Sequence, residues 1–520
     1  MTNQWLNHAV FYEIYPQSFC DSNGDGIGDI QGIISKLDYI EELGCNAIWM
    51  NPCFDSPFVD AGYDVRDYYK VAPRYGTNED LKQLFIEAHQ RNMHVILDLV
   101  PGHTSIESDW FKQSCKAEKN AYTDRYIWSD TVWNAPVGVG SITGWYRGGY
   151  DRDGAAALNF FTAQPALNYG FYEKDEGQDW QQDMNDAGPL ATRDEIKNIM
   201  RFWCGLGCDG FRVDMAGSLV KNDPDKAGTI ALWKDVSGFL KKEFPEAVMV
   251  SEWGEPDKAL EAGFDMDFLL HFGPSHYPDL FRTEHPFFSH LAQGNLDAFW
   301  NIYQQNYEKA VKNGGLICIP SGNHDMDRMA RTLDKEESKI AFAFLLSMPG
   351  APFIYYGDEI GMRYVDVPHS IEGGYYRTGS RSPMQWDTST NAGFSSARKE
   401  DLYIMQDEEG MKTINVASEE ADENSLLHEV QDLIEIRKEH PALGNCASFK
   451  LVQNGYPLIY ERESEDEKIL VILNPGDQDQ KVDVDLNGEV IYSYHGNSIH
   501  ENVVSSRSAF FIRKLLFTDK

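Results

Sequence analysis

Three carboxylic acids in this sequence each stand at, or just beyond, the end of a short apolar run. Asp214 ends one such run, Glu252 follows a second directly, and Asp325 comes shortly after a third. Charged side chains are rarely buried in a strand unless they are paired or work at its end. Because the carboxyl ends of parallel strands meet at one edge of a sheet, the sequence predicts that the three acids converge there.

Arg212 lies two residues before Asp214, so both side chains emerge on the same face of the predicted strand. For an isolated Arg-x-Asp the simplest interpretation is a structural ion pair. The two further acids in the same setting favour a group of carboxyls that carries out nucleophilic and acid–base chemistry.

The segments that would position these acids alternate between strand and helix. The eight predicted strands are residues 9–16, 47–51, 94–100, 210–214, 247–252, 265–270, 316–320 and 352–356. The predicted helices are residues 29–43, 78–92 with Asn78 as cap, 192–203 with a Thr192–Glu195 capping box, 230–244, 340–348 and 423–437. This alternation favours an α/β fold of the (β/α)8 TIM barrel type. An open doubly wound sheet is the alternative, although no dinucleotide-type glycine motif follows the first strand.

Two regions depart from this alternation. From residue 104 the chain is rich in Gly, Trp, Tyr, Asn and Asp without a helical period, and the last part of the chain consists of short alternating strands. We therefore expect a catalytic barrel over residues 1–103 and 178–440, an inserted subdomain after strand three over residues 104–177, and a C-terminal antiparallel β-sandwich domain over residues 441–520.

Composition narrows the class of partner. The chain has 520 residues, with 46 Lys and Arg against 82 Asp and Glu, a net charge of −36. That charge disfavours nucleic acid and anionic membranes and is compatible with a small neutral substrate. The sequence contains no basic and apolar leader and no run of about 18 apolar residues. Its eight cysteines form no metal or disulfide pattern, so a reduced, cytoplasmic protein is expected.

Several motifs, in this order along the chain, resemble the α-amylase family of glycoside hydrolases, family 13, and its oligo-1,6-glucosidase branch most closely. The matching stretches are residues 21–29, 62–64, 98–103, 210–214, 251–252, 323–325, 355–359 and 381–386. The resemblance extends over nearly the whole length and implies a retaining glycosidase. In such enzymes the two working carboxyls stand roughly 5–5.5 Å apart.

The resemblance also implies roles for individual residues. Asp214 is expected to be the nucleophile, Glu252 the general acid and base, and Asp325 a transition-state stabiliser. The expected substrate-binding residues are Tyr63, which stacks beneath the first sugar, His103 and His324, which hydrogen-bond it, Arg212, which keeps Asp214 ionised, and Asp64 with Arg381, which close the pocket behind the non-reducing end.

The loop Asp21–Asp29 carries oxygen side chains at its positions 1, 3, 5 and 9 and glycine at position 6. Position 12 is Gly32 in place of the glutamate of an EF-hand. Related glucosidases bind calcium in this loop, and the resemblance implies a structural Ca²⁺ held by Asp21, Asn23, Asp25, the Ile27 carbonyl and Asp29. An Asx-rich turn without metal is the alternative. No organic cofactor is expected.

Three positions depart from the family pattern: Gly102, Ala166 and Met215. The last follows the expected nucleophile, so linkage preference is not carried over. We expect a retaining exo-acting α-glucosidase of short gluco-oligosaccharides or disaccharides. The alternative is a transglycosylase or isomerase of the trehalose synthase or sucrose-converting type. An inactive homologue like the heavy chains of amino-acid transporters is disfavoured, because the acids are intact and a membrane span is missing. The oligomeric state, monomer or homo-oligomer, is not determined by the sequence.

Overall fold

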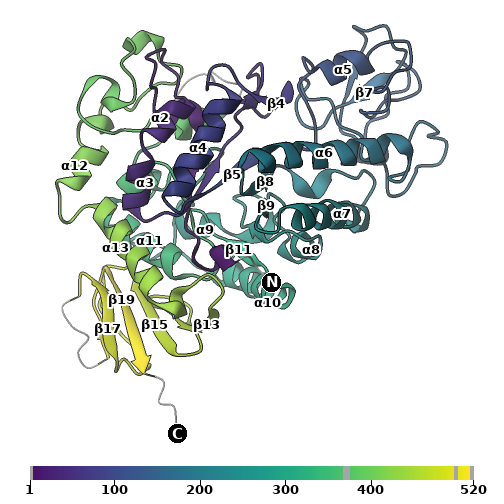
Figure 1. Ribbon diagram of the computed structural model, residues 1–520. Helices are drawn as coiled ribbons and strands as arrows, with labels where there is room; N and C mark the ends of the chain where they lie inside the picture. The colour runs from purple at the N-terminus through teal and green to yellow at the C-terminus, as the bar shows by residue number, and fades with distance from the viewer. Residues whose placement is uncertain (1–3, 367–374, 497–501, 516–520) are drawn as a thin grey trace.

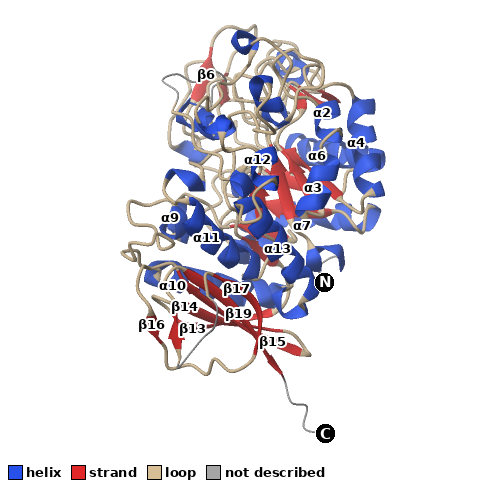
Figure 2. Ribbon diagram, turned by 90° about the vertical axis from the view of Figure 1, so that its left-hand side faces the viewer, coloured by secondary structure: helices blue, strands red, loops and turns tan. Residues whose placement is uncertain are grey.

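The computed structural model describes residues 4–366, 375–496 and 502–515. A barrel of parallel strands surrounded by helices forms the centre, and the two smaller parts lie at different sides of it (Figures 1 and 2). The segment with α5 and β7 lies beyond α6, whereas the C-terminal sheet packs beneath α11 and α13 (Figure 1).

Eight parallel strands make the barrel. They are β1 (Phe11–Ile14), β2 (Ala47–Met50), β5 (His94–Leu99), β8 (Gly210–Val213), β9 (Val248–Ser251), β10 (Met266–Phe268), β11 (Leu316–Cys318) and β12 (Phe353–Tyr355). The order is β11-β10-β9-β8-β5-β2-β1-β12, and a parallel bridge from Pro320 to Phe353 joins the two ends. The predicted TIM barrel and all eight predicted strands are therefore confirmed.

Alternate strand residues fill the barrel interior, as the period of two requires. Trp49, Val250, Met266 and Phe353 belong to one cluster of fully buried side chains inside the barrel. Their neighbours along each strand point outward, against the surrounding helices. The interior is thus a packed core, and the strand ends above it are left to carry polar residues.

Helices cover the outside of the barrel (Figure 2). They are α1 (Pro16–Phe19), α2 (Ile30–Ile34), α3 (Leu37–Leu43), α4 (Asn78–Gln90), α6 (Ala187–Leu206), α7 (Ala227–Glu243), α8 (Pro256–Glu261), α9 (Pro278–Phe281), α10 (Asp297–Asn313), α11 (Lys335–Ser347), α12 (Val416–Glu420) and α13 (Leu426–Glu439). The single helix predicted over residues 29–43 is two helices, α2 and α3, broken at Ser35 and Lys36.

Two predicted helix caps were wrong. Thr77, and not Asn78, caps α4, because Thr77 and Asp80 satisfy each other's backbone N–H groups in a reciprocal capping box. Thr192 lies inside α6, where its hydroxyl donates to the Gly188 carbonyl. The helix begins earlier, at Ala187, and Pro189 is tolerated there because its missing N–H is no loss in a first turn.

The inserted subdomain is built from short elements. It contains α5 (Asp109–Ser114) and an antiparallel pair, β6 (Trp145–Arg147) and β7 (Ala155–Ala157). A second small pair, β3 (Phe54–Asp55) with β4 (Asp67–Val71), follows β2. Elements this short show no period in the sequence, which explains why none was predicted there.

The C-terminal part is an antiparallel sheet domain. Its main sheet has the order β13 (Ser448–Gln453), β14 (Leu458–Glu463), β15 (Glu467–Asn474), β19 (Ser508–Leu515), β17 (Glu489–Tyr494), and β16 (Gln480–Lys481) pairs with β18 (Val503–Val504). Val482 and Val504 pack with Ile472 and Phe510 on one face, and the opposite face packs on α11. The predicted sandwich is thus unequal, a five-stranded sheet against a two-stranded one.

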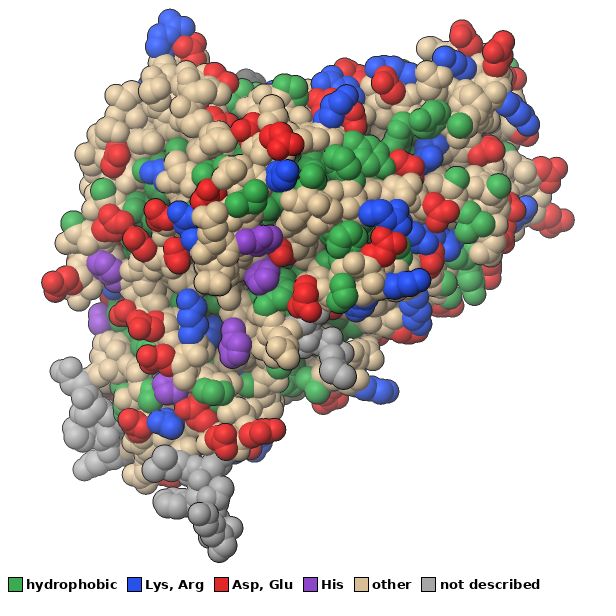
Figure 3. Space-filling view, viewed as in Figure 1, with side chains coloured by type: hydrophobic (Ala, Val, Ile, Leu, Met, Phe, Trp, Pro, Cys, Tyr) green, Lys and Arg blue, Asp and Glu red, His purple; other side chains and the backbone are tan. Residues whose placement is uncertain are grey.

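Acidic and basic side chains are interspersed over the face drawn in Figure 3. Within the described ranges, no helix combines the length and apolar character needed to cross a membrane.

Candidate active site

A cavity of about 540 Å³ opens at the carboxyl ends of the barrel strands. Asp214 follows β8, Glu252 follows β9, and Asp325 lies in the loop beyond β11; all three line this cavity. Tyr63 and His103 line it as well. The structure therefore brings together at this cavity the three acids and two of the three ring-bearing residues that the sequence predicted for one site. The third, His324, is buried beside Asp325 and does not line the cavity.

The buried guanidinium of Arg212 contacts three carboxylates: Asp214 and Glu252, which line the cavity, and Asp98. Arg212 Nη1 donates to Asp98 Oδ1 at 2.9 Å and to Asp214 Oδ1 at 3.1 Å, and its Nη2 lies 3.1 Å from Glu252 Oε2. Arg212 is 3% exposed. A buried cation with three carboxylate neighbours offsets their mutual repulsion and holds them in fixed positions.

The protonation of these acids follows from burial and from one another. Burial, and then the proximity of Glu252, raise the pKa of Asp214 well above its ordinary value, and Arg212 opposes both. Burial likewise raises the pKa of Asp98 to about 6. Burial therefore favours the protonated form of Asp214, and the charge of Arg212 is what favours its carboxylate form.

Asp325 has the opposite environment. Its Oδ1 accepts from Arg377 Nη1 at 2.9 Å and from Arg381 Nη2 at 2.8 Å. Burial alone would raise the pKa of Asp325, but it is held well below its ordinary value. Burial strongly depresses the pKa of the adjacent His324, so its ring is neutral and carries no stabilising charge. The positive charge that stabilises the Asp325 carboxylate therefore comes from Arg377 and Arg381. Asp325 is thus a fixed anion.

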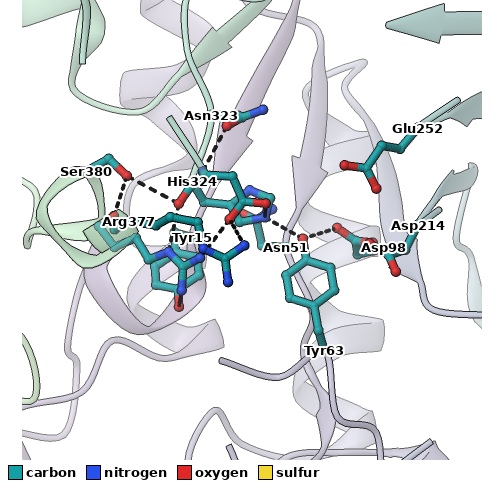
Figure 4. Close-up of polar contacts among 12 residues, drawn as sticks. Tyr15, Asn51, Tyr63, Asp98, Asp214, Glu252, Asn323, His324, Arg377 and Ser380 are labelled. Carbon is teal, nitrogen blue, oxygen red and sulfur yellow. Dashed lines mark hydrogen bonds and ion pairs between the residues drawn. The ribbon is translucent and has the colours of Figure 1, made fainter. Parts of the chain in front are cut away.

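Tyr63 links the carboxylates around Arg212 with His324, the neighbour of Asp325 (Figure 4). Its hydroxyl donates to Asp98 Oδ2 at 3.0 Å and lies 2.6 Å from His324 Nε2. The other ring nitrogen of His324 lies 2.9 Å from Glu13 Oε1 and 3.0 Å from Asn51 Nδ2. Glu13 and Asn51 were missed from the sequence. Glu13 could have been found, since it is a charged residue inside a predicted barrel strand.

His103 is held in one tautomer by its two partners. Asn159 Nδ2 can only donate, at 2.9 Å from Nδ1, so Nε2 carries the proton and donates to the Tyr63 carbonyl at 2.9 Å. Burial lowers the pKa of His103 to about 4, which keeps the ring neutral. The sequence carried no signal for Asn159, which comes from the inserted subdomain.

The predicted contact between Asp64 and Arg381 is wrong. Asp64 is fully buried, and its carboxylate accepts from the N–H groups of Val59 and Asp60 and from the Ser56 hydroxyl. These bonds shape the loop and leave no oxygen facing the cavity. Arg381 instead donates to Asp325 and to the His324 carbonyl.

Asp60 and Arg377 occupy the place predicted for that pair. Both line the cavity, where Arg377 Nη2 donates to Asp60 Oδ1 at 3.4 Å while its Nη1 donates to Asp325. Gln164 donates to the other oxygen of Asp60 at 2.8 Å. Burial raises the pKa of Asp60 to about 6, against the opposing charge of Arg377. This carboxylate–guanidinium contact ties the loop after β2 to the segment after β12.

The outer half of the cavity is largely apolar. Phe160 and Phe272 line it while being 59% and 55% exposed, whereas most phenylalanines of the chain are buried. Met215 and Trp253 line the cavity as well, and the Trp253 ring packs against Gly217, where a Cβ would meet its Nε1 at 2.6 Å. Exposed rings at the mouth of a polar pocket are suited to contact the apolar faces of sugar rings.

The loop Asp21–Asp29 folds as a series of turns around its own side chains. Asp21 accepts from the N–H groups of Asn23, Gly24 and Gly26, and Asn23 accepts from Asp25. Among the described residues, the loop's three aspartates do not bring one oxygen each within 4.8 Å of one another. The donor set suits a hard cation, but its oxygens are held in hydrogen bonds here, and calcium stays a prediction.

Chelation should lower the melting temperature if that prediction holds. An ion at about 100 times its Kd adds roughly 2.7 kcal/mol, or about 2–3 °C for a chain of this size. Asp25→Asn is the control, because Asp25 is exposed and, within the part of the chain that the structure describes, accepts only from the Ile27 N–H. This variant should no longer respond to chelator. A melting temperature unchanged by both chelator and added calcium, with no metal in the native protein, would contradict the site.

Comparisons with known proteins agree with this geometry. The profile of the α-amylase catalytic domain matches residues 13–445. The chain is similar to a trehalose synthase/amylase of Mycobacterium tuberculosis, at 31% identity over 93% of this chain and 84% of that protein. It is equally similar, at 31%, to a glucan 1,6-alpha-glucosidase of Streptococcus pneumoniae, over 93% and 94% of the two chains. The solved trehalose-6-phosphate hydrolase of Bacillus licheniformis has a TM-score of 0.81 at 26% identity, covering 99% of this chain and 100% of that one.

Proposed function

The chain belongs to the α-amylase family of glycoside hydrolases, and we propose that it is a retaining, exo-acting α-glucosidase of short gluco-oligosaccharides or disaccharides. The observation that carries this proposal is the contact of both Asp214 and Glu252 with Arg212, in a cavity whose lining also includes the Asp60–Arg377 contact. Membership of the family makes the protein a glycoside hydrolase.

The proposed reaction uses two displacements. An Asp214 oxygen attacks the anomeric carbon while Glu252 gives its proton to the departing glycosidic oxygen, so that the aglycone leaves as a neutral alcohol. In the second step Glu252 takes a proton from water, the water oxygen attacks the same carbon, and the bond to Asp214 breaks. Asp325, held as an anion by its two arginines, stabilises the positive charge that develops on the sugar.

Action at the chain end is supported by Asp60 and Arg377. Their contact stands on the cavity wall beside Asp325, where it would meet the hydroxyls of a terminal glucose. A polymer threading past this wall would have to break a charge-assisted bond. The proposal therefore expects glucose to be released one unit at a time and starch to be a poor substrate.

Asp60→Asn should lower kcat/KM on maltose or isomaltose by about 10- to 150-fold, the effect of losing roughly 1.5–3 kcal/mol from a charged hydrogen bond. The same loss should develop in the wild type as pH falls through the Asp60 pKa of about 6, because protonation removes the charge. Steady-state kinetics between pH 4.5 and 7.5 measure both effects.

The matched control is Asp64→Asn, four residues away and outside the cavity. It should lower the melting temperature, because Asp64 orders the loop, while its residual activity keeps the wild-type pH profile. Rapid cleavage of end-blocked maltoheptaosides by the wild type would show that the cavity is open at this end and would remove the exo-acting proposal.

Transfer to a sugar acceptor is the second candidate function. It is favoured by the apolar outer half of the cavity, where Phe160 and Phe272 would hold an acceptor sugar in competition with water. The similar trehalose synthase/amylase shows that such an activity exists among relatives. Products from maltose, isomaltose, sucrose and trehalose separate the two: free glucose indicates hydrolysis, and a new disaccharide indicates transfer.

Proton NMR of the first product tests the mechanism itself. Because two displacements each invert the anomeric carbon, an α-glucoside should first release α-glucose. Initial release of β-glucose would overturn the retaining mechanism.

A further inference from the structure

A buried carboxyl that does not line the cavity contacts the turn that carries Glu252. Asp267 lies on β10, and its Oδ1 accepts from the Ser251 hydroxyl at 2.7 Å. The same oxygen accepts the N–H groups of Trp253 at 3.2 Å and Gly254 at 3.3 Å. One oxygen thus binds the residues on both sides of Glu252.

The strand geometry puts Asp267 behind Glu252. Val250 and Met266 point into the barrel core, so Ser251 and Asp267, their neighbours along β9 and β10, point outward. Ser251 and Asp267 are also paired in register. Glu252 lines the cavity whereas Asp267 is absent from its lining. Asp267 therefore cannot touch a substrate held in the cavity.

The buried carboxyl of Asp267 lowers the stability of the fold. Asp267 is fully buried, and among the described residues its Oδ2 has no hydrogen-bond partner. Burial raises its pKa to about 7, although the Ser251 and backbone donors oppose the shift. A buried and half-satisfied carboxyl destabilises a fold unless it organises something that apolar residues cannot.

Asp267 organises the sharp turn that follows Glu252. An apolar residue at position 267 would leave the backbone N–H groups of this turn without an acceptor. Gly254 has a φ of +73°, and a Cβ there would meet Leu270 Cδ1 at 2.8 Å, so the turn depends on glycine. Without Asp267, the backbone N–H groups of Trp253 and Gly254 would lose this acceptor, and the Ser251 hydroxyl would keep only its longer contact with the Met266 carbonyl, at 3.3 Å. Glu252 is fixed on its other side by the Met215 N–H, which donates to Oε2 at 3.0 Å.

We propose that Asp267 is a positioning residue that fixes the orientation of Glu252 for proton transfer. This inference rests on the proposed function, in which Glu252 protonates the leaving group. A general acid must lie within hydrogen-bond reach of the oxygen it protonates, and a displacement of about 1 Å can lower the rate about 100-fold.

The test compares leaving groups in Asp267→Leu. With maltose, whose leaving group needs the proton, kcat/KM should fall about 10- to 100-fold. With α-glucosyl fluoride, whose leaving group departs without full protonation, it should fall less than about threefold. Asp267→Asn keeps an acceptor oxygen and should restore maltose hydrolysis to within about fivefold of wild type.

Asp265→Leu is the matched control. Asp265 precedes the same strand, is 5% exposed, and accepts the Met249 N–H at 3.0 Å, but at the strand end away from the cavity. It should destabilise the fold and affect both substrates alike. Should Asp267→Leu not fold, Ser251→Ala removes one of the three bonds and should show the same selectivity at about two- to fivefold.

Equal losses on both substrates in Asp267→Leu and in Ser251→Ala, or no loss in either, would overturn the positioning role. Glu252→Gln is measured beside them. If Glu252→Gln discriminates between the two substrates and the Asp267 and Ser251 variants do not, only the positioning role fails. If Glu252→Gln itself does not discriminate, the proposed role of Glu252 fails first.

Discussion

Replacing Asp214 by asparagine lowers kcat/KM for α-glucosides by a factor of roughly 10³ or more, as expected when a nucleophile in a tightly coupled group is removed. The neutral amide cannot form the glycosyl intermediate. Arg212 keeps Asp98 and Glu252 as partners in this variant, so the fold should persist. Steady-state kinetics and the melting temperature, measured on the same preparation, separate lost chemistry from lost structure.

The smaller variant Asp214→Gly gives the sharper experiment. The space left by the side chain admits azide, which attacks from the face that Asp214 would have used and inverts the anomeric carbon. From α-glucosyl fluoride the product should therefore be β-glucosyl azide, which NMR identifies. Turnover near the wild-type rate in Asp214→Asn, or an α-azide from Asp214→Gly, would contradict the assignment of Asp214 as nucleophile.

The barrel was predictable because most of its strands are short, nearly continuous apolar runs bounded by turn residues, as expected of strands buried on both faces. The helices were less predictable at their ends. Thr192 with Glu195 has the pattern of a capping box, yet α6 starts at Ala187, because packing of a long amphipathic face decides where a helix begins. The short pairs of the inserted subdomain have too few residues for either period to appear.

Within the site, the sequence predicted the charges better than their partners. Asp60 and Asp64 are four residues apart, as are Arg377 and Arg381. Residue type alone does not show which aspartate and which arginine meet in the cavity. The loop that carries the two aspartates takes left-handed φ values at Phe58 and Ala61, residue types that rarely adopt them. That conformation turns Asp64 toward backbone donors and leaves Asp60 in the cavity, and nothing in the residue types shows it.

Asp267 illustrates a signal that was present and not used. It stands between Met266 and Phe268 in a predicted strand. In a barrel whose interior is apolar, a carboxyl between two inward residues must face the outer layer. There it needs donors, and the turn after the neighbouring strand is the nearest source of N–H groups. The inward and outward alternation along β10, combined with the position of β10 beside β9, would have pointed to the turn after β9, which carries Glu252.

Replacing Glu252 by glutamine should lower kcat/KM for maltose by about 10²- to 10⁴-fold, the usual contribution of a general acid. The amide keeps the acceptor for the Met215 N–H, so the turn should be preserved. It cannot give a proton to the glycosidic oxygen. For α-glucosyl fluoride, which needs little help to depart, kcat/KM should stay within about tenfold of wild type.

The two steps respond differently because Glu252 acts in both. With the fluoride, the first displacement proceeds and the second lacks its base, so the glycosyl intermediate on Asp214 should accumulate and be visible by mass spectrometry of the intact protein. Azide needs no base and should restore turnover. Because it displaces Asp214 from the opposite face, its product should be α-glucosyl azide, the anomer opposite to that from Asp214→Gly. Equal loss on maltose and fluoride, or the same azide anomer from both variants, would mean that the two carboxyls do not divide the roles of nucleophile and acid–base in the way that their shared contact with Arg212 suggests.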